Sequence, residues 1–247
     1  MTHDLTNLLR EWPYDEERMV RKIPADDGRE VLQVRLPLGI EQYELEGRPD
    51  GLHPGGFESV LDEIEADLAQ HVEIEGSSAG FEVDRETATR LHGEGLLYYY
   101  RYLMLFQIND YDRVRRDTEH NLRLCRLLEQ YCPIEEDRNA VLQFKPYILR
   151  MNAVARAMLA VNRHARSVAA GILKGAIEEI ENLEEIDTAA FRFERVRSVN
   201  YLKSALEQIG DQALDAEERL RRQLSEAVEE ENYERAAELR DRIRNLR

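Results

Sequence analysis

The stretch of residues 96–106 reads LLYYYRYLMLF, and it decides how the middle of the chain is expected to fold. Bulky apolar and aromatic residues occupy nearly every side of a helix over this stretch, which is typical of a helix buried among others. The sequence therefore predicts that it is the central helix of a helical domain. Asp84 can cap the start of this helix, and residues 109–111 form a tight turn after it.

Three tyrosines of this stretch are candidate site residues, namely Tyr98, Tyr99 and Tyr102. Tyrosine combines a large contact area with a polar hydroxyl, so the group can line a groove for a ligand or a peptide. The alternative is that these side chains fill the core around a buried helix. Both interpretations stay open at the level of the sequence.

Helical periodicity continues beyond the turn as far as residue 209. The pattern predicts further helices over residues 112–131, 135–161, 166–183 and 189–209. Pro146 is expected to kink the second of these helices, and Gly210 is expected to end the last. The middle of the chain is therefore predicted to be an antiparallel bundle of helices.

This middle region resembles tetratricopeptide repeats, because two helix–turn–helix units are followed by a closing helix. The segment LFQINDYDRV, residues 105–114, resembles that family's inter-helix turn. The turns are spaced more widely than the repeat period of about 34 residues. A helical bundle without repeat ancestry therefore remains an alternative.

The N-terminal part has a different character from the helical middle. Apolar residues between turn signals over residues 19–45 predict a three-stranded antiparallel meander. Gly28 can adopt the positive φ that the first hairpin turn needs. Apolar spacing predicts a helix over residues 57–70, and residues 76–80 are expected to be a flexible linker.

The C-terminal residues 220–246 read LRRQLSEAVEEENYERAAELRDRIRNL, in which two helical apolar stripes meet at a short polar turn. Small alanines let two antiparallel helices approach closely, so the segment predicts an αα-hairpin. The fold class is thus mainly α, a helical-repeat-like bundle with a small N-terminal β-meander and a C-terminal αα-hairpin. The expected domains are residues 1–76, 81–210 and 213–247.

The hairpin closely resembles the UVR motif of the excision-repair proteins UvrB and UvrC. The resemblance is carried by Ala227, Val228, Glu231, Tyr233, Glu234, Ala236, Ala237, Leu239, Arg240, Asp241 and Ile243. It implies protein–protein contact and not catalysis. A hairpin of this length is shorter than the roughly 40 residues below which a domain usually needs a partner or another staple.

The expected partner-binding residues form the apolar face and charged rim of the hairpin. They are Leu220, Leu224, Val228, Glu231, Tyr233, Glu234, Ala237, Arg240, Asp241 and Ile243. The partner is expected to be another protein or a second copy of the chain in a homodimer. The alternative is a terminal helix pair that docks on its own domain.

The charge balance argues against nucleic acid as a direct partner. Asp and Glu number 50 against 34 Lys and Arg, which leaves a formal net charge of −16. Affinity for a duplex rests on Lys and Arg that neutralise phosphates.

The N-terminus lacks the pattern of a signal peptide, and no apolar run reaches the length of a membrane span. The protein is therefore expected to be soluble and cytoplasmic, with no membrane contact.

Neither a metal nor a cofactor is expected from the motifs present. Cys125 and Cys132 form no CxxC pair, so burial as small hydrophobic residues is predicted for both. The six histidines lack His or Cys partners at ligand spacing. The chain also contains no phosphate-binding GxxxxGK[ST], no HExxH and no GxSxG.

These observations favour a non-enzymatic adaptor that binds a protein through its C-terminal hairpin. A first alternative is an accessory protein of nucleotide excision repair that docks UvrB or UvrC. A second is an enzyme whose site lies between the N-terminal meander and the helix that carries Tyr98 and Tyr102; for this alternative the sequence supplies no catalytic residues.

Overall fold

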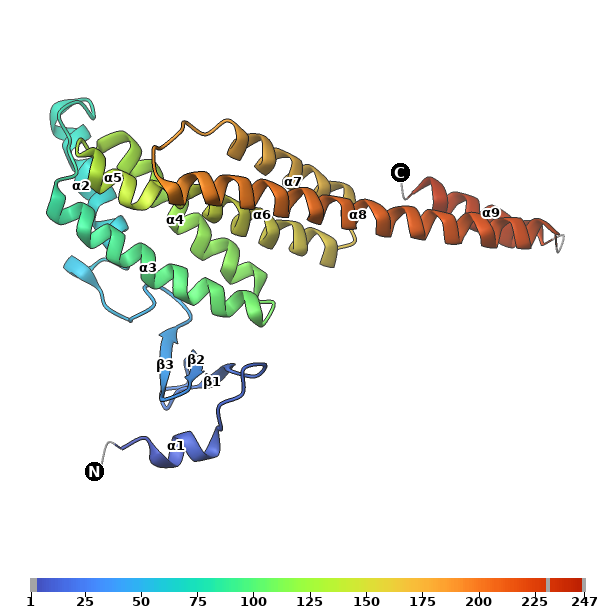
Figure 1. Ribbon diagram of the computed structural model, residues 1–247, viewed down its shortest axis with the longest axis horizontal. Helices are drawn as coiled ribbons and strands as arrows, with labels where there is room; N and C mark the ends of the chain where they lie inside the picture. The colour runs from blue at the N-terminus through green and yellow to red at the C-terminus, as the bar shows by residue number, and fades with distance from the viewer. Residues whose placement is uncertain (1–3, 230–231, 246–247) are drawn as a thin grey trace.

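The computed structural model describes residues 4–229 and 232–245, and within residues 210–219 and at Arg222 it describes the backbone alone. The chain is mainly α-helical, with a three-stranded sheet near its N-terminus and a helix pair at its C-terminus (Figure 1), which confirms the predicted fold class. Among the described residues, no helix has both the length and the apolar character needed to cross a membrane.

The N-terminal region consists of a short helix and an antiparallel meander. The helix is α1 (Thr6–Glu11), and the strands are β1 (Val20–Pro24), β2 (Glu30–Leu36) and β3 (Gly39–Glu44), paired in the order β1-β2-β3. Gly28 has a φ of 85°, and its amide donates to the Ala25 carbonyl at 2.9 Å. The predicted meander and its first turn are thus confirmed.

Helix α2 (Val60–Glu75) follows the glycine-rich loop and a short 3-10 turn, η1 (Pro54–Gly56). The prediction started this helix at Phe57, which instead precedes it and is 38% exposed. The helix starts at Val60 because Ser59 caps it, with its hydroxyl accepting from the Asp62 amide at 3.0 Å. Gly76 ends the helix in the left-handed conformation.

The remaining helices form the body and the C-terminal pair. They are α3 (Arg85–Gln107), α4 (Tyr111–Tyr131), α5 (Glu135–Leu142), α6 (Lys145–Asn162), α7 (Arg166–Glu181), α8 (Ala189–Glu229) and α9 (Tyr233–Arg244). Asp84 caps α3 as predicted, since its carboxylate accepts from the Thr87 amide at 2.8 Å. A single helix with a kink at Pro146 was expected here. Instead the helix is interrupted just before Pro146, where α5 ends at Leu142 and α6 begins at Lys145.

The central helix of the body is α6 and not α3, which corrects the prediction. Helix α6 packs against α4, α7 and α8, and small side chains such as Ala153, Ala157 and Ala160 let these neighbours approach it closely. Helix α3 packs mainly against α4 and α5, and it leaves Leu96 and Tyr100 42% and 49% exposed. Helix α3 therefore lies nearer the edge of the body, with part of its surface exposed, whereas the small side chains of α6 let it have helices around it.

Helix α8 corrects a second prediction, because it does not stop at Gly210 but continues unbroken to Glu229. A glycine inside a helix costs only about 1 kcal/mol, and strong helix formers such as Gln212, Ala213 and Leu214 follow it. The expected boundary between residues 210 and 213 thus falls within one helix. As a result, α8 runs out of the body and carries α9 away from it (Figure 1).

The meander packs on the helical body through a shared apolar cluster. Leu32, Tyr43 and Leu45 pack in one cluster with Leu105 of α3 and Val114 of α4. The sheet therefore belongs to the same folded unit as the helices it touches.

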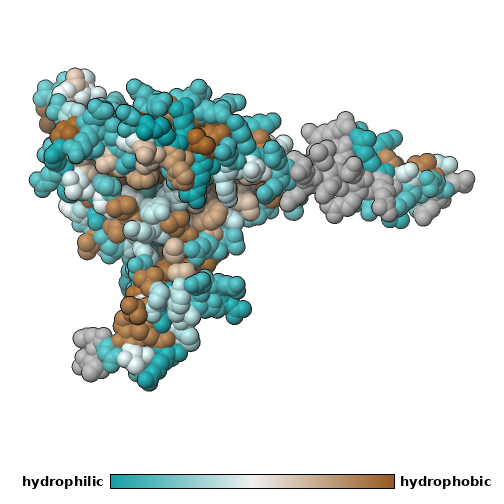
Figure 2. All heavy atoms as spheres, in the orientation of Figure 1, coloured by the Kyte–Doolittle hydropathy of each residue, from teal (hydrophilic) through white to brown (hydrophobic). Residues whose placement is uncertain are grey.

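The surface seen in Figure 2 is mostly hydrophilic over the body, as the formal charge of −16 leads one to expect.

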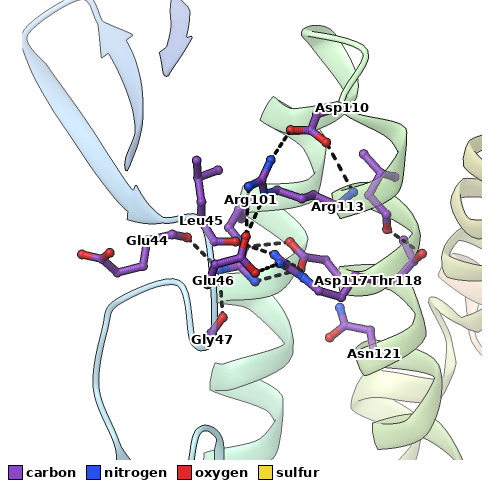
Figure 3. A network of polar contacts seen from close by, with 12 residues as sticks. Glu44, Leu45, Glu46, Gly47, Arg101, Asp110, Arg113, Asp117, Thr118 and Asn121 are labelled. Atoms are coloured by element: carbon purple, nitrogen blue, oxygen red, sulfur yellow. Dashed lines mark hydrogen bonds and ion pairs between the residues drawn. The ribbon is translucent and has the colours of Figure 1, made fainter. Parts of the chain in front are cut away.

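A buried ion pair fastens the segment after β3 to the body (Figure 3). Arg101 of α3 bonds the carboxylate of Asp117 of α4 through Nε and Nη2, at 2.7 and 2.8 Å. Its Nη1 donates to the carbonyl oxygens of Glu44 and Gly47 at 2.7 and 2.9 Å. One guanidinium thus joins two helices and the segment that leads out of the sheet.

Candidate functional site

The C-terminal hairpin is built by the end of α8 and by α9, which pack antiparallel against each other. Of the hairpin side chains that the structure describes, four are buried in its interior, namely Leu220, Ala227, Ala236 and Leu239. Leu224 and Ile243 are partly buried against them. The two facing alanines lack long side chains, so the helix backbones can approach closely and the leucines close the core.

The turn of the hairpin is held by Asn232, which precedes α9. Its amide donates to the Ala227 carbonyl at 2.8 Å, and its side-chain oxygen accepts from the Arg235 amide at 3.2 Å. An asparagine at this position satisfies one of the amides that the first helical turn leaves unpaired. Glu234 in the first turn and Arg242 and Arg244 in the last turn suit the helix dipole.

The structure divides the predicted partner-binding residues into two groups. Leu220, Leu224 and Ile243 belong to the interior of the hairpin, where they pack on α8 and α9 themselves. The apolar face that was expected to meet a partner is therefore largely covered within the hairpin. This difference arises because two short helices satisfy each other's apolar stripes before they can offer them to another molecule.

The second group lies on the outside of the hairpin. Val228 and Tyr233 flank its turn and are 50% and 69% exposed. The other exposed members are Glu234, Ala237, Arg240 and Asp241. Glu231 lies outside the described residues. These side chains, and not the interior stripe, are the ones that a partner can reach.

The charged side chains on α9 make only weak contacts among themselves. Arg240 Nε and Arg244 Nη2 lie 3.8 and 3.7 Å from the Asp241 carboxylate, and all three side chains are more than half exposed. Exposed pairs of this kind contribute about 0–1 kcal/mol. Both arginines can therefore turn to acidic groups of a partner at little cost.

The tyrosines of α3 have different environments. Tyr98 is buried, and its ring stacks on that of His120 with centroids 3.7 Å apart. Tyr99 and Tyr102 meet edge to face at 5.6 Å, and both line a cavity among the helices. The lining residues of that cavity lie between His92 and Arg197, so they include none of the meander, where the alternative enzyme site was expected. Tyr98 therefore acts as a core residue, and the groove interpretation stays a prediction for the other two.

Buried charged residues are the feature that sequence reasoning missed. Glu94 of α3 is fully buried, and its carboxylate accepts from the amides of Val60 and Leu61 at 2.7 and 3.0 Å. Arg48 lies 3.2 Å from the same carboxylate. Glu94 and Arg101 stand two helical turns apart, on the face that also carries Tyr98. Their position on the same helix face as the apolar Leu91 and Leu105 was the available signal.

The two cysteines are buried and unpaired, as predicted. Burial raises the pKa of the Cys125 thiol to about 12, so this side chain is a poor nucleophile and a poor metal ligand at neutral pH. Within the described part of the chain, His, Cys, Asp and Glu form no cluster of three that could hold a metal ion.

Comparison with protein-family models gave a match that coincides with the hairpin. Residues 218–247 match the UvrB/uvrC motif, UVR. This match confirms the resemblance carried by the C-terminal sequence, whereas it does not extend to the tetratricopeptide-like middle. Searches of curated proteins and of solved structures found no match.

Proposed function

We propose that this protein is a non-enzymatic adaptor that binds a protein partner through the outer surface of its UVR hairpin. The observation that carries the proposal is the position of the hairpin. Helix α8 extends it beyond the helical body, and α9 packs against α8 (Figure 1). A module in that position contributes little to the stability of the body, so its sequence is free to serve recognition.

The small interior of the hairpin supports the same proposal. Among the hairpin side chains that the structure describes, the four buried ones include two alanines, and a hairpin of this length is small for an independent unit. Contact of a partner with Val228 and Tyr233 would cover apolar surface that now faces solvent. Each apolar side chain that becomes fully buried would contribute about 1.5–3 kcal/mol before the costs of association.

A second copy of the chain is the simplest partner for this surface. Two hairpins related by a two-fold axis would form a four-helix bundle with a closed interface. The exposed Arg240, Asp241 and Glu234 would then select the register of the two copies. The same geometry suits a helix pair from a different protein, so the adaptor function does not depend on the homodimer.

The test is sedimentation of the full chain against a variant with both Val228→Asp and Tyr233→Asp. These residues lie outside the hairpin interior, so the variant is expected to stay folded while any dimer dissociates. Val196→Asp on α8 is the matched control, because Val196 is 62% exposed but lies in the body. We call the variant with Val228→Asp and Tyr233→Asp the tip variant. A complex that persists in the tip variant, or that Val196→Asp disrupts equally, would contradict the assigned surface.

A narrower form of the proposal is an accessory role in nucleotide excision repair, in which the hairpin docks UvrB or UvrC. The match of residues 218–247 to the UvrB/uvrC motif favours it. Titration of purified UvrB and UvrC with the full chain tests it directly, and loss of binding in the tip variant is expected. If neither protein binds while the hairpin holds another partner, the adaptor function stands without this pathway.

Three further expectations stay with the proposal. We expect no appreciable direct binding to nucleic acid, because the formal net charge is −16. The cytoplasmic location remains a prediction from the sequence. So does the tetratricopeptide-like organisation of residues 81–210, which would provide a rigid scaffold from which α8 projects.

A further inference from the structure

A cavity of about 270 Å³ lies among α3, α4, α5, α6 and α8, and its lining is mostly apolar. Leu96 and Phe144 line it and are 42% and 43% exposed, so the cavity reaches the surface. An engineered cavity of about 150 Å³ can take up benzene. By that measure there is room here for a molecule of two fused rings, with roughly ten to twelve non-hydrogen atoms.

Three tyrosine rings and one phenylalanine give the cavity aromatic walls. Tyr102 and Tyr147 are nearly parallel at an interplanar angle of 27°, and Tyr99 stands at 90° to Tyr102. Their ring centroids are 6.4 and 5.6 Å apart, respectively. Burial raises the pKa of Tyr102 and of Tyr147 above the ordinary value of 10.0, so both hydroxyls remain protonated. Walls of this kind favour a flat ring over a branched aliphatic molecule.

Three of the residues around the cavity carry a buried polar atom without a hydrogen-bond partner. These atoms are Tyr102 Oη, Asn121 Oδ1 and Glu194 Oε2. Buried polar atoms are normally paired, so unpaired atoms gathered around one cavity need an explanation. Each atom is almost fully covered as the side chains stand, so a bound molecule with the complementary donors and acceptor would pair with them after small side-chain rotations.

Each of these atoms defines what a ligand must offer. Asn121 Nδ2 donates to the Gly95 carbonyl at 3.0 Å, so its Oδ1 is left as an acceptor. Glu194 Oε2 lies 4.0 Å from Arg150 Nη2, which is beyond hydrogen-bond distance, and is a second acceptor. Tyr102 contributes a hydroxyl that can donate. The complementary molecule therefore carries N–H donors and one acceptor.

Gly95 supplies an independent sign that this space is kept open. A glycine inside a helix is less favourable than alanine. A Cβ at Gly95 would lie 3.6 Å from Leu124 Cδ1 and 3.7 Å from Asn121 Oδ1, both ordinary contacts. Packing against neighbours therefore does not require glycine here, whereas a side chain would occupy the cavity that Gly95 lines.

We propose that this cavity is a binding site for a small planar heteroaromatic molecule that carries N–H donors. The aromatic walls hold the ring, Asn121 and Glu194 accept its N–H groups, and Tyr102 donates to a ring acceptor. Arg197 also lines the cavity, and its Nη1 lies 3.5 Å from Glu194 Oε1, so it offsets the carboxylate charge and the ligand need not be cationic. This site is separate from the hairpin, and the inference does not rest on the adaptor function.

The test uses the full chain and two bicyclic probes of equal size in isothermal titration calorimetry. 2-Aminobenzimidazole has N–H donors and a ring acceptor, whereas 2-methylbenzoxazole has the same shape and no N–H. The first is expected to bind with a dissociation constant below about 1 mM. The second is expected to bind at least about tenfold more weakly, because it leaves the buried acceptors unpaired. Absence of binding by the first probe, or equal binding of both, would overturn the proposal.

Variants assign the binding to this cavity. Tyr102→Phe removes a hydroxyl that has no partner, so it should leave the fold intact and weaken 2-aminobenzimidazole binding several-fold. Tyr98→Phe is the matched control, because Tyr98 is a buried tyrosine of the same helix that does not line the cavity. Gly95→Leu should abolish binding by filling the space. Unchanged affinity in Tyr102→Phe, or an equal loss in Tyr98→Phe, would show that the probe does not occupy this site.

Discussion

Arg101 and Asp117 form a bidentate ion pair between α3 and α4 in which both side chains have no exposure to solvent. A buried pair of this kind is tolerable only when its remaining donors are satisfied. Arg101 meets this condition because its third nitrogen, Nη1, donates hydrogen bonds to the carbonyl oxygens of Glu44 and Gly47. The cost of burying the charges is thereby offset, and Arg101 adds polar contacts to the apolar cluster that holds the meander on the body.

Replacing Asp117 by Asn should therefore destabilise the whole body. It leaves the Arg101 charge buried without its counter-ion, which is expected to cost about 3–5 kcal/mol of unfolding free energy. Urea denaturation followed by circular dichroism measures this. Asp187→Asn is the matched control, because Asp187 pairs with Arg192 while 98% exposed and should change stability by less than about 1 kcal/mol. Similar small effects of both variants would contradict the assigned role.

A second prediction concerns the hairpin and its small core. Leu239→Ala removes a leucine that is buried there, and a change of this kind in a core costs about 2–5 kcal/mol. Because the hairpin packs mainly on itself, we expect it to open locally while the body stays folded. Hydrogen exchange should accelerate in residues 232–245 and remain unchanged in α4 and α6. Tyr233→Ala is the control, since the Tyr233 side chain is 69% exposed and its removal leaves the core untouched. If residues 232–245 exchange no faster in Leu239→Ala than in Tyr233→Ala, the assigned packing is wrong.

Much of the fold could be predicted because its signals are local. The first turn of the meander needs a residue with positive φ, and Gly28 supplies it. Asp84 caps α3, and the apolar period of about 3.6 residues marks the helices of the body correctly. Gly210 was wrongly predicted to end α8, because a single glycine stops a helix only when the residues beyond it prefer another structure.

The candidate sites were harder to predict because they depend on tertiary contacts. The apolar residues of the hairpin were identified, but the sequence does not say that Leu220 and Leu239 cover each other and leave Val228 outside. Similarly, Tyr102 and Glu194 lie far apart in the sequence, and only the packing of α3 and α8 brings both to one cavity. Spacing within one helix gives no sign of such a site.

A third prediction concerns stability in acid. Burial alone would raise the pKa of Asp110, but its bonds to Lys22 at 2.7 Å and Arg113 at 3.0 Å outweigh this and hold the pKa below its ordinary 3.8. A carboxyl with a lowered pKa in the folded state stabilises the fold fully above the pKa of the unfolded state. That contribution is lost as the pH falls from about 4 through the lower folded pKa.

The measurement is the melting temperature of the parent and of Asp110→Asn between pH 7 and pH 2.5. The parent should be more stable at pH 7, and the difference should shrink below about pH 4, where this carboxyl becomes protonated in the unfolded state before it does in the folded state. Asp26→Asn is the control, because no ion pair or hydrogen bond is assigned to this exposed carboxyl and its substitution should not alter the profile. A difference that stays constant down to pH 2.5 would rule out the charged form of Asp110 as its source.

The last prediction concerns the reactivity of the two thiols along α4. Cys125 lies in the middle of the helix with no exposure, and burial raises its pKa to about 12. At pH 8 only about one thiol in ten thousand would then be ionised, and reagent reaches it only when the structure opens. Cys132 follows the last residue of α4 and is 3% exposed, with burial raising its pKa as well. Helix ends open at a lower free energy than helix centres.

We therefore expect Cys132 to react with a disulfide reagent faster than Cys125, and both to react at once in denaturant. Cys125→Ala and Cys132→Ala each leave one thiol, so their rates separate the two sites. The rate at Cys125 should follow the free energy of global unfolding and rise with urea, whereas the rate at Cys132 should be less sensitive to it. Rapid reaction of Cys125 in the folded protein would show that the core formed by α4 with α2 and α3 is open, because Cys125 packs in that cluster with Leu61 and Leu91.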